Sequence, residues 1–246
     1  MAKSLKITSN VKTHVGNKRS VNQDAFLAQP EMGVWIVADG MGGHHNGEYA
    51  SGLLTQKISI PDNVTGFNQT VDFIKSLIRS KNTELFYYAK KLGESVKCGT
   101  TLVALVIRGN KIAILWVGDS RVYRFDPAVN ALSQITVDHT VFNSLQQKGL
   151  VDDFHPMAEQ YKGALARVVG GEEDVVVDEI RLVLKESERF LLCTDGINKE
   201  LSDDELSSIL SKNEAPGVTC DTMIAESLKK TGKDNMTACV VDIMFI

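Results

Sequence analysis

Six apolar stretches along the chain have the length and composition of buried β-strands, namely residues 34–38, 101–107, 111–117, 121–125, 189–194 and 236–246. Gly109 and Asn110 form a two-residue turn between the second and third stretches, which is typical of a tight β-hairpin. Residues 118–120 separate the third and fourth stretches, a connection too short for a helical crossover. The middle of the chain is therefore predicted to form consecutive antiparallel strands rather than a doubly wound parallel sheet.

Helical spacing of apolar residues is found in five segments, residues 48–58, 71–92, 141–148, 203–210 and 220–230. The longest segment has one apolar face, formed by Val71, Ile74, Leu77, Ile78, Leu85, Tyr88 and Leu92. Asp138, His139 and Thr140 precede the third segment, where we expect a polar side chain to cap the helix. Helices combined with antiparallel strands predict a layered α+β fold with the helices packed outside the sheets.

Composition and charge exclude several classes of protein. The 246 residues include 27 Lys and Arg against 31 Asp and Glu, a net charge of −4, and 43% of them are hydrophobic. These values exclude a disordered chain, a collagen-like chain and a polytopic membrane protein, and they favour a single domain over residues 1–246. The chain has no cluster of Lys and Arg and no apolar run of about 18 residues, so we expect neither nucleic acid nor a membrane as partner.

The cysteines and the N-terminal segment indicate the cellular compartment in which the protein is found. Cys98, Cys193, Cys220 and Cys239 form no CxxC pair, which excludes a zinc knuckle and a thioredoxin-like motif. Three of the four lie in or beside apolar stretches, so we expect buried free thiols rather than disulfides. The N-terminal segment lacks the apolar core of a signal peptide. These features predict a cytoplasmic protein.

Aspartates recur where the apolar strands end. Asp39, Asp119 and Asp195 each follow a predicted strand directly, and Asp234 lies just before the last one. One such aspartate is typical of a turn, but four at one edge would require cations, because like charges raise each other's pKa. Oxygen ligands without nearby Cys or His favour Mg²⁺ or Mn²⁺ over zinc. The backbone carbonyl of Gly40 can also approach an ion closely, because this residue has no Cβ.

Several other catalytic motifs are excluded by inspection. Asp234 follows Gly232-Lys233 where a Walker A motif needs Ser or Thr, and His45 stands where a dinucleotide fingerprint needs glycine. No cysteine has the arginine six positions later that a cysteine phosphatase needs, and GxSxG and HExxH are absent. Arg19 is either an ordinary surface residue or a bidentate phosphate clamp. Metal chemistry is the interpretation that these exclusions leave.

Seven short motifs lead to a family resemblance. They are Arg19-x-x-Asn22-Gln23-Asp24, Val37-Ala-Asp39-Gly40-Met41-Gly42-Gly43-His44, Gly99-Thr100-Thr101, Val117-Gly118-Asp119-Ser120-Arg121, Asp138-His139-Thr140, Thr194-Asp195-Gly196 and Asp234-Asn235-x-Thr237. In their order and residues they resemble the motifs of the bacterial metal-dependent (type 2C, PPM family) protein serine/threonine phosphatases. The resemblance covers about residues 12–246, which is nearly the whole chain.

The resemblance implies both a fold and a metal centre. The fold would be a four-layer α-β-β-α sandwich, in which two antiparallel sheets are flanked by helix pairs. Two Mg²⁺ or Mn²⁺ ions would lie at one end of the sandwich. Asp39 would bridge both ions and the Gly40 carbonyl would bind one of them. Asp195 and Asp234 would hold the other ion.

Three further roles follow from the same resemblance. Asp119, together with Asp195, would bind a third, weaker ion, and Asp24 would lie in the outer shell. Arg19 would bind the substrate phosphate. The implied reaction is hydrolysis of phosphoserine or phosphothreonine on proteins by a metal-activated water, without a covalent enzyme intermediate.

The chain departs from the family pattern at two positions near these residues. Gln23 replaces a glutamate found in many relatives, so one outer carboxylate is lost and we expect weaker metal binding. Met41 stands where eukaryotic members carry a histidine that can act as general acid. Protonation of the leaving group is therefore unassigned, with a metal-bound water and His44 as the two candidates. Residues 149–170 are expected to form a flap over the cleft.

The sequence therefore predicts a metal-dependent phosphatase that acts on phosphoproteins, opposes a bacterial Ser/Thr kinase and is a monomer. Two alternatives stay open. One is a phosphoprotein-binding module that has lost turnover, although no expected metal aspartate is missing. The other is a two-metal phosphoesterase acting on a small molecule, which turnover of nucleotides compared with a phosphopeptide would distinguish.

Overall fold

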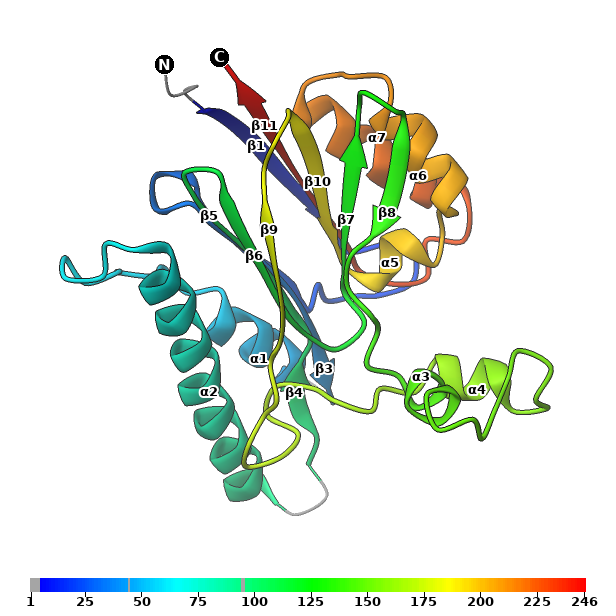
Figure 1. Cartoon of the computed structure of the whole chain (residues 1–246). Helices are drawn as coiled ribbons and strands as arrows, with labels where there is room; N and C mark the ends of the chain where they lie inside the picture. The colour runs from blue at the N-terminus through cyan, green and yellow to red at the C-terminus, as the bar shows by residue number, and fades with distance from the viewer. Residues whose placement is uncertain (1–4, 44, 94–95) are drawn as a thin grey trace.

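Two antiparallel sheets lie face to face in the computed structural model, which describes residues 5–43, 45–93 and 96–246 (Figure 1). We name each sheet after a central strand. The β11 sheet has the strand order β1 (Leu5–His14), β11 (Met236–Phe245), β10 (Glu188–Cys193), β7 (Arg121–Asp126), β8 (Ala131–Gln134). The β3 sheet has the order β2 (Asp24–Gln29), β3 (Val34–Gly42), β5 (Leu102–Arg108), β6 (Lys111–Val117), β9 (Asp178–Val183), and β4 (Cys98–Thr100) also pairs with β3.

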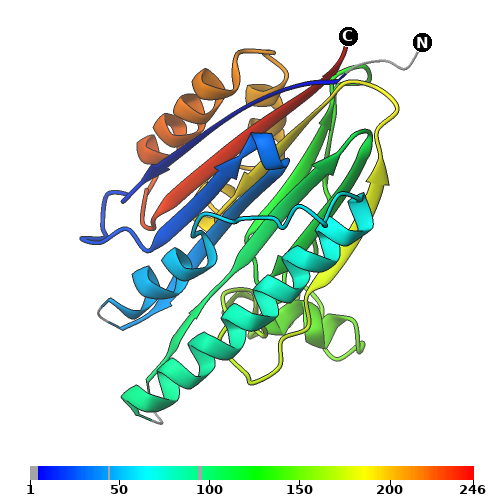
Figure 2. The same ribbon diagram turned by 90° about the vertical axis from the view of Figure 1, so that its left-hand side faces the viewer.

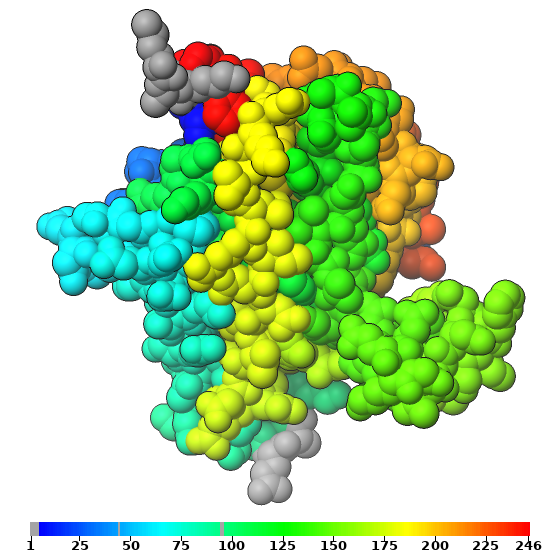
Figure 3. All heavy atoms as spheres, in the orientation of Figure 1, coloured from blue at the N-terminus to red at the C-terminus, as the bar shows by residue number. Residues whose placement is uncertain are grey.

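Helices cover the outer face of each sheet. On the β3 sheet lie α1 (Asn46–Leu54) and α2 (Phe67–Leu92), and Figure 2 shows α2 running across this face. On the β11 sheet lie α5 (Asp195–Asn198), α6 (Asp203–Leu210) and α7 (Pro216–Lys229). Two short helices, α3 (Val141–Gln146) and α4 (Ala158–Lys162), form a lobe beside the sheets (Figure 3), and η1 (Pro30–Met32) connects β2 to β3. The predicted α+β fold, a four-layer α-β-β-α sandwich, is thus confirmed.

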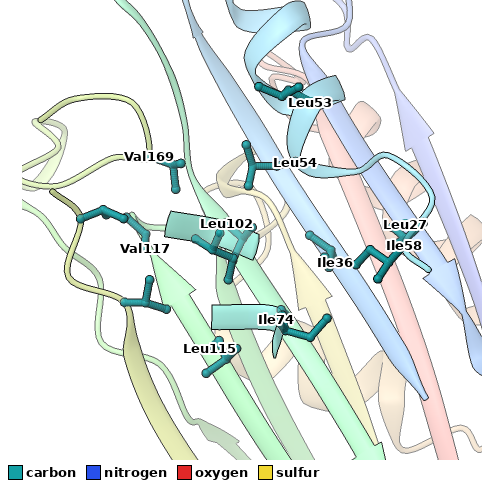
Figure 4. Close-up of a cluster of buried hydrophobic side chains, with 14 of the residues drawn as sticks. Leu27, Ile36, Leu53, Leu54, Ile58, Ile74, Leu102, Leu115, Val117 and Val169 are labelled. Atoms are coloured by element: carbon teal, nitrogen blue, oxygen red, sulfur yellow. The ribbon is translucent and has the colours of Figure 1, made fainter. Parts of the chain in front are cut away.

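Alternation of side chains along the central strands produces three hydrophobic cores between the four layers. In β5, Leu102 and Val106 face α1 and α2, whereas Val103 and Leu105 face the other sheet. Figure 4 shows part of the core under the helices, with Leu27, Ile36, Leu53, Leu54, Ile58, Ile74, Leu102, Leu115, Val117 and Val169 labelled. Because the central strands are buried on both faces, their apolar runs are continuous in the sequence.

The hairpin predicted in the middle of the chain is confirmed, but the next connection differs from the expectation. Arg108 pairs with Lys111 across β5 and β6, and Gly109 in the turn has a φ of 56°. The strands on either side of residues 118–120 are not consecutive in one sheet, because β6 belongs to the β3 sheet and β7 to the β11 sheet. These three residues, which include Asp119, therefore cross from one sheet to the other.

Other boundaries also differ from the apolar pattern. It does not predict β1, β2, β4, β8 and β9, which are short or carry exposed side chains, and it misses α4 and α5. α2 begins at Phe67 rather than at residue 71, α7 begins at Pro216 rather than at residue 220, and α1 ends at Leu54 rather than at residue 58. Proline is favourable in the first turn of a helix, where its missing N–H costs nothing.

Three smaller predictions concern the cysteines, a helix cap and the membrane. All four cysteines are free and buried, as expected. Thr140 caps α3 as expected, because its hydroxyl accepts a hydrogen bond from the Asn143 backbone N–H at 3.2 Å. Across the described parts of the chain, no helix is both long enough and apolar enough to cross a membrane.

Candidate metal centre

Most of the predicted site residues lie together at one end of the sandwich, where they line one cavity. Asp24 of β2 and Asp39 of β3 are register partners in the β3 sheet. Asp119 follows β6, whereas Asp195 opens α5 and Asp234 lies just before β11. The cavity has a volume of about 270 Å³ and is lined by Arg19, Asp39, Gly40, Asp119, Asp195 and Asp234, together with Gln23, Met41 and Lys199. Asp24, the remaining predicted residue, is buried at 8% exposure.

Asp24 joins the two sheets. Its Oδ2 accepts hydrogen bonds from the hydroxyls of Thr194 at 2.8 Å and Thr237 at 2.7 Å, both from the β11 sheet side. Its Oδ1 is buried and has no hydrogen-bond partner among the described residues. Burial raises the pKa of Asp24 to about 7, and the nearby charge of Asp195 adds to the shift. The second oxygen of this carboxylate thus has no described partner to offset its burial.

The backbone at Asp39 is hydrogen-bonded to the segment that joins β4 to β5, about 60 residues later in the chain. The Asp39 carbonyl accepts hydrogen bonds from the Thr101 N–H at 2.8 Å and the Thr100 hydroxyl at 2.9 Å. Burial, followed by the charge of Asp24, raises the pKa of Asp39 well above its ordinary value. A Cβ on Gly40 would lie 2.0 Å from the carbonyl oxygen of Gly47 in α1, so this position requires glycine for packing.

Asp234 forms a bidentate ion pair with Arg19. Nε of Arg19 donates to Oδ1 at 2.8 Å and Nη2 donates to Oδ2 at 2.9 Å. This hydrogen-bonded pair raises the pKa of Arg19. The side-chain amide of Asn235 donates to the carbonyls of Val15 at 2.8 Å and Val21 at 3.0 Å. Asn235 therefore holds the loop that carries Arg19 beside the strand that follows Asp234.

Lys199 contacts two of the predicted aspartates. Its Nζ donates to Oδ2 of Asp195 and lies 3.9 Å from Oδ2 of Asp119. Burial raises the pKa of Asp119 to about 6, with Asp195 adding to this shift and Lys199 opposing it. Burial disfavours the charge on Lys199, but the nearby Asp195 outweighs it, so the pKa of Lys199 is raised. One ammonium group therefore partly neutralises both carboxylates.

The donors in this cavity suit a hard divalent cation. Among the described residues that line it, all the ionisable acceptors are carboxylates, and Gly40 lines the cavity with them. Within the described part of the chain, two buried carboxylate oxygens lack partners, Oδ1 of Asp24 and Oδ1 of Asp195. No three acidic, histidine or cysteine side chains among the described residues already form a ligand cluster. Arg19 and Lys199 hold two of the carboxylates instead, and these carboxylates would become ligands once released.

The residues at which the chain departs from the family pattern also lie here. Gln23 and Met41 both line the cavity. His44, the candidate proton donor, lies outside the described residues. From the expected flap over residues 149–170, Gly163 and Leu165 line the cavity.

A larger neighbouring cavity of about 720 Å³ lies between the α3–α4 lobe and the β11 sheet, and it shares Asp119, Gly163 and Lys199 with the first.

Sequence reasoning missed Lys199 and the supporting role of Thr194. Lys199 lies four residues after Asp195, a spacing that places two side chains on one face of a helical turn and could have identified the pair. Thr194 is part of a quoted motif, but its bond to Asp24 joins residues 170 positions apart. No local pattern predicts such a contact.

The protein phosphatase 2C family profile matches residues 12–238. The serine/threonine phosphatase stp of Listeria monocytogenes is 31% identical over 238 residues, which cover 94% of each protein. The structure of PppA, a key regulatory component of T6SS in Pseudomonas aeruginosa, is 34% identical with a TM-score of 0.85, and the match covers 96% of each chain. The catalytic domain of PstP in complex with two manganese ions is 26% identical with a TM-score of 0.79, covering 98% of this chain and 100% of that one. The chain therefore belongs to the protein phosphatase 2C family.

Proposed function

We propose that this chain is a metal-dependent protein serine/threonine phosphatase whose active site is the cavity around Asp39, Asp195 and Asp234. One observation carries the proposal. Aspartates from both sheets and an arginine surround one cavity of about 270 Å³, and two buried carboxylate oxygens of the cluster lack partners within the described residues. Family membership supports the same reaction class.

The roles of the acidic residues are those that the family resemblance implies, and their places around one cavity support them. Asp39 would bridge two Mg²⁺ or Mn²⁺ ions and Gly40 would offer its carbonyl to one of them. Asp195 and Asp234 would hold the other ion. The ions, when bound, supply Lewis acidity toward a phosphoryl group and activate a water for attack in line. The manganese ions in the related PstP structure support this choice of metal.

Two further aspartates would support this centre. Asp119 and Asp195 would hold a third, weaker ion. Asp24 would act from outside the direct ligands, since its Oδ2 is already used by Thr194 and Thr237. These two hydrogen bonds would hold Asp24 between the sheets, and so keep Asp39 of the β3 sheet close to Asp195 and Asp234 on the β11 sheet side.

Arg19 would bind the phosphate of the substrate. The Arg19 side chain is 56% exposed, and its guanidinium can bind a phosphate in the same bidentate manner in which it holds Asp234. The described residues that line the cavity include no histidine, and Met41 has no proton to give. Protonation of the leaving group therefore falls to water or to His44.

A phosphoprotein is the substrate that the surroundings support. The neighbouring cavity of about 720 Å³ leads away from Asp119 and has room for the chain on either side of a phosphorylated residue. Such a substrate is formed by a Ser/Thr kinase, which we propose as the functional counterpart.

We also propose that the protein is a monomer with one catalytic domain over residues 1–246. We place it in the cytoplasm, where its four free thiols would stay reduced.

Hydrolysis of a phosphothreonine peptide tests the function. Phosphate release should require Mn²⁺, stop with EDTA and be lost in the Asp195→Asn variant. Release from nucleotides but not from the peptide would instead favour a small-molecule phosphoesterase. A protein that binds Mn²⁺ and the phosphopeptide without turnover would be a binding module.

A further inference from the structure

Lys199 places its ammonium group between two carboxylates of the cavity. Nζ bonds Oδ2 of Asp195 and lies 3.9 Å from Oδ2 of Asp119. The Asp119 and Asp195 side chains are only 9% and 12% exposed. These are the two carboxylates to which the proposed function assigns a third ion. A cationic group of the chain itself therefore lies where that ion would bind.

The local fold directs Lys199 to this place. Lys199 follows the single turn of α5, and its backbone N–H donates to the Asp195 carbonyl at 2.9 Å. Side chains four residues apart on a helical turn lie on the same face, which brings the lysine over Asp195. Asp119 reaches the same point from the connection between β6 and β7. Two separate segments thus present their carboxylates to one ammonium.

A surface lysine paired with a carboxylate four residues away would by itself mean little. Two observations distinguish this pair. Both carboxylates are buried, so water and salt screen the ammonium less than at an open surface. In addition, Oδ1 of Asp195 is buried without a partner in the described part of the chain, so this carboxylate has a free ligand position beside the ammonium.

We propose, resting on the function proposed above, that Lys199 competes with the third divalent ion for Asp119 and Asp195. The ammonium occupies the position while the ion is absent and turns away when the ion binds. The Lys199 side chain is 55% exposed, so it has solvent on one side into which it can rotate. The lysine thereby weakens the third ion most, because it contacts both aspartates assigned to that ion.

Titration of the purified full chain with Mn²⁺ alone tests the competition, with calorimetry to give affinities and electron paramagnetic resonance to count bound ions. In Lys199→Met, the third Mn²⁺ should bind about tenfold more tightly than in the wild type, and the tighter ion that shares Asp195 should gain less than the third ion does. Lys199→Arg keeps the charge and should restore the wild-type affinity. Lys229→Ala removes the same charge from an exposed position on α7 and is the matched control.

Adding Asp119→Asn to Lys199→Met should remove the gain, because a ligand of the third ion is then lost. Unchanged affinity for the third ion in Lys199→Met, or an equal gain in Lys229→Ala, overturns the proposal. Thermal melts check folding before each titration, and Lys199→Gln replaces the Met variant if that one does not fold. Phosphopeptide hydrolysis by the wild type is measured separately, so a failure of the proposed function is distinguishable from a failure of the competition.

Discussion

Arg19 and Asp234, which both line the cavity, form a bidentate ion pair with N···O distances of 2.8 and 2.9 Å. Arg19 is the residue proposed to bind the substrate phosphate, and Asp234 is a proposed metal ligand. The ion pair therefore uses the carboxylate oxygens that Asp234 would offer to a metal ion and the N–H groups that Arg19 would offer to a phosphate. Release of Asp234 to a cation frees the guanidinium for a phosphate, so metal binding and phosphate binding should favour one another.

Replacing Arg19 with alanine should weaken substrate binding without weakening metal binding. The value of kcat/KM for a phosphothreonine peptide is expected to fall about 10- to 100-fold, the usual effect of losing a charge-assisted hydrogen bond to phosphate. The affinity for Mn²⁺ should stay equal or rise, because Asp234 loses its competing cation. Arg79→Ala, on the exposed side of α2, is the control. A kcat/KM within about twofold of wild type would contradict the assignment of Arg19.

Asp39→Asn should remove metal binding while leaving the fold intact. Burial and neighbouring carboxylates raise the pKa of Asp39, so its charge is unfavourable in the metal-free protein. The amide removes that charge without creating a cavity, and the metal-free variant should melt at the wild-type temperature or above it. Mn²⁺ affinity and peptide hydrolysis should both fall by more than about 100-fold. Calorimetry and phosphate release measure the two effects, and wild-type turnover would refute the metal assignment.

The strands buried on both faces were predictable, and the edge strands were not. β5 and β6 are continuous apolar runs because each lies between a helix layer and the other sheet. β1, with the sequence LKITSNVKTH, is an edge strand with polar side chains over much of its length. Its place depends on pairing with β11, from Leu5 with Phe245 to His14 with Met236. A pairing between the two ends of the chain has no local signal.

The same division applies to the site. Asp39, Asp119, Asp195 and Asp234 could be selected because each lies beside an apolar run that is readable in the sequence. The predicted strand end before Asp39 was wrong, since β3 continues to Gly42. The long-range hydrogen bonds that hold these aspartates in place could not be predicted from the sequence. Asp24 accepts a hydrogen bond from Thr237, 213 residues away, and this contact exists only because two sheets stack in one register. Likewise, Arg19 meets Asp234 across 215 residues.

The stability of the metal-free protein should fall as pH rises. Burial raises the pKa of Asp24 from 3.8 to about 7, so the folded state binds this proton more tightly than the unfolded state does. The resulting stabilisation is complete below the unfolded pKa and is lost as pH rises through the folded one, about 3 kcal/mol between roughly pH 5 and pH 8. Asp24→Asn, whose amide oxygen can still accept from Thr194 and Thr237, should lose less. Urea unfolding with EDTA present measures both, and equal losses would contradict the prediction.

Mn²⁺ should reverse this electrostatic penalty and stabilise the wild type. At a free concentration about 100 times the dissociation constant, one ion adds about 2.7 kcal/mol to the free energy of unfolding. In a chain of this length that corresponds to a rise in Tm of about 5–10 °C. Calorimetric melts with Mn²⁺ and with EDTA measure the shift. Asp39→Asn should show almost none of it, and an equal shift in that variant would place the ion elsewhere.

Gly196→Ala should damage the metal centre through the backbone. A Cβ at this position would lie 1.9 Å from the carbonyl oxygen of Asn235, so the segments that carry Asp195 and Asp234 would have to move apart. We expect a loss of about 1–3 kcal/mol in stability, and Mn²⁺ affinity lowered at least tenfold. Gly52→Ala in α1 is the matched control, because its added Cβ would meet no described atom within 4 Å beyond its chain neighbours and the nearby backbone of its own helix, and alanine favours a helix by about 0.5–1 kcal/mol. If both variants keep wild-type affinity for Mn²⁺, the close contact at Gly196 does not set the distance between the two aspartates.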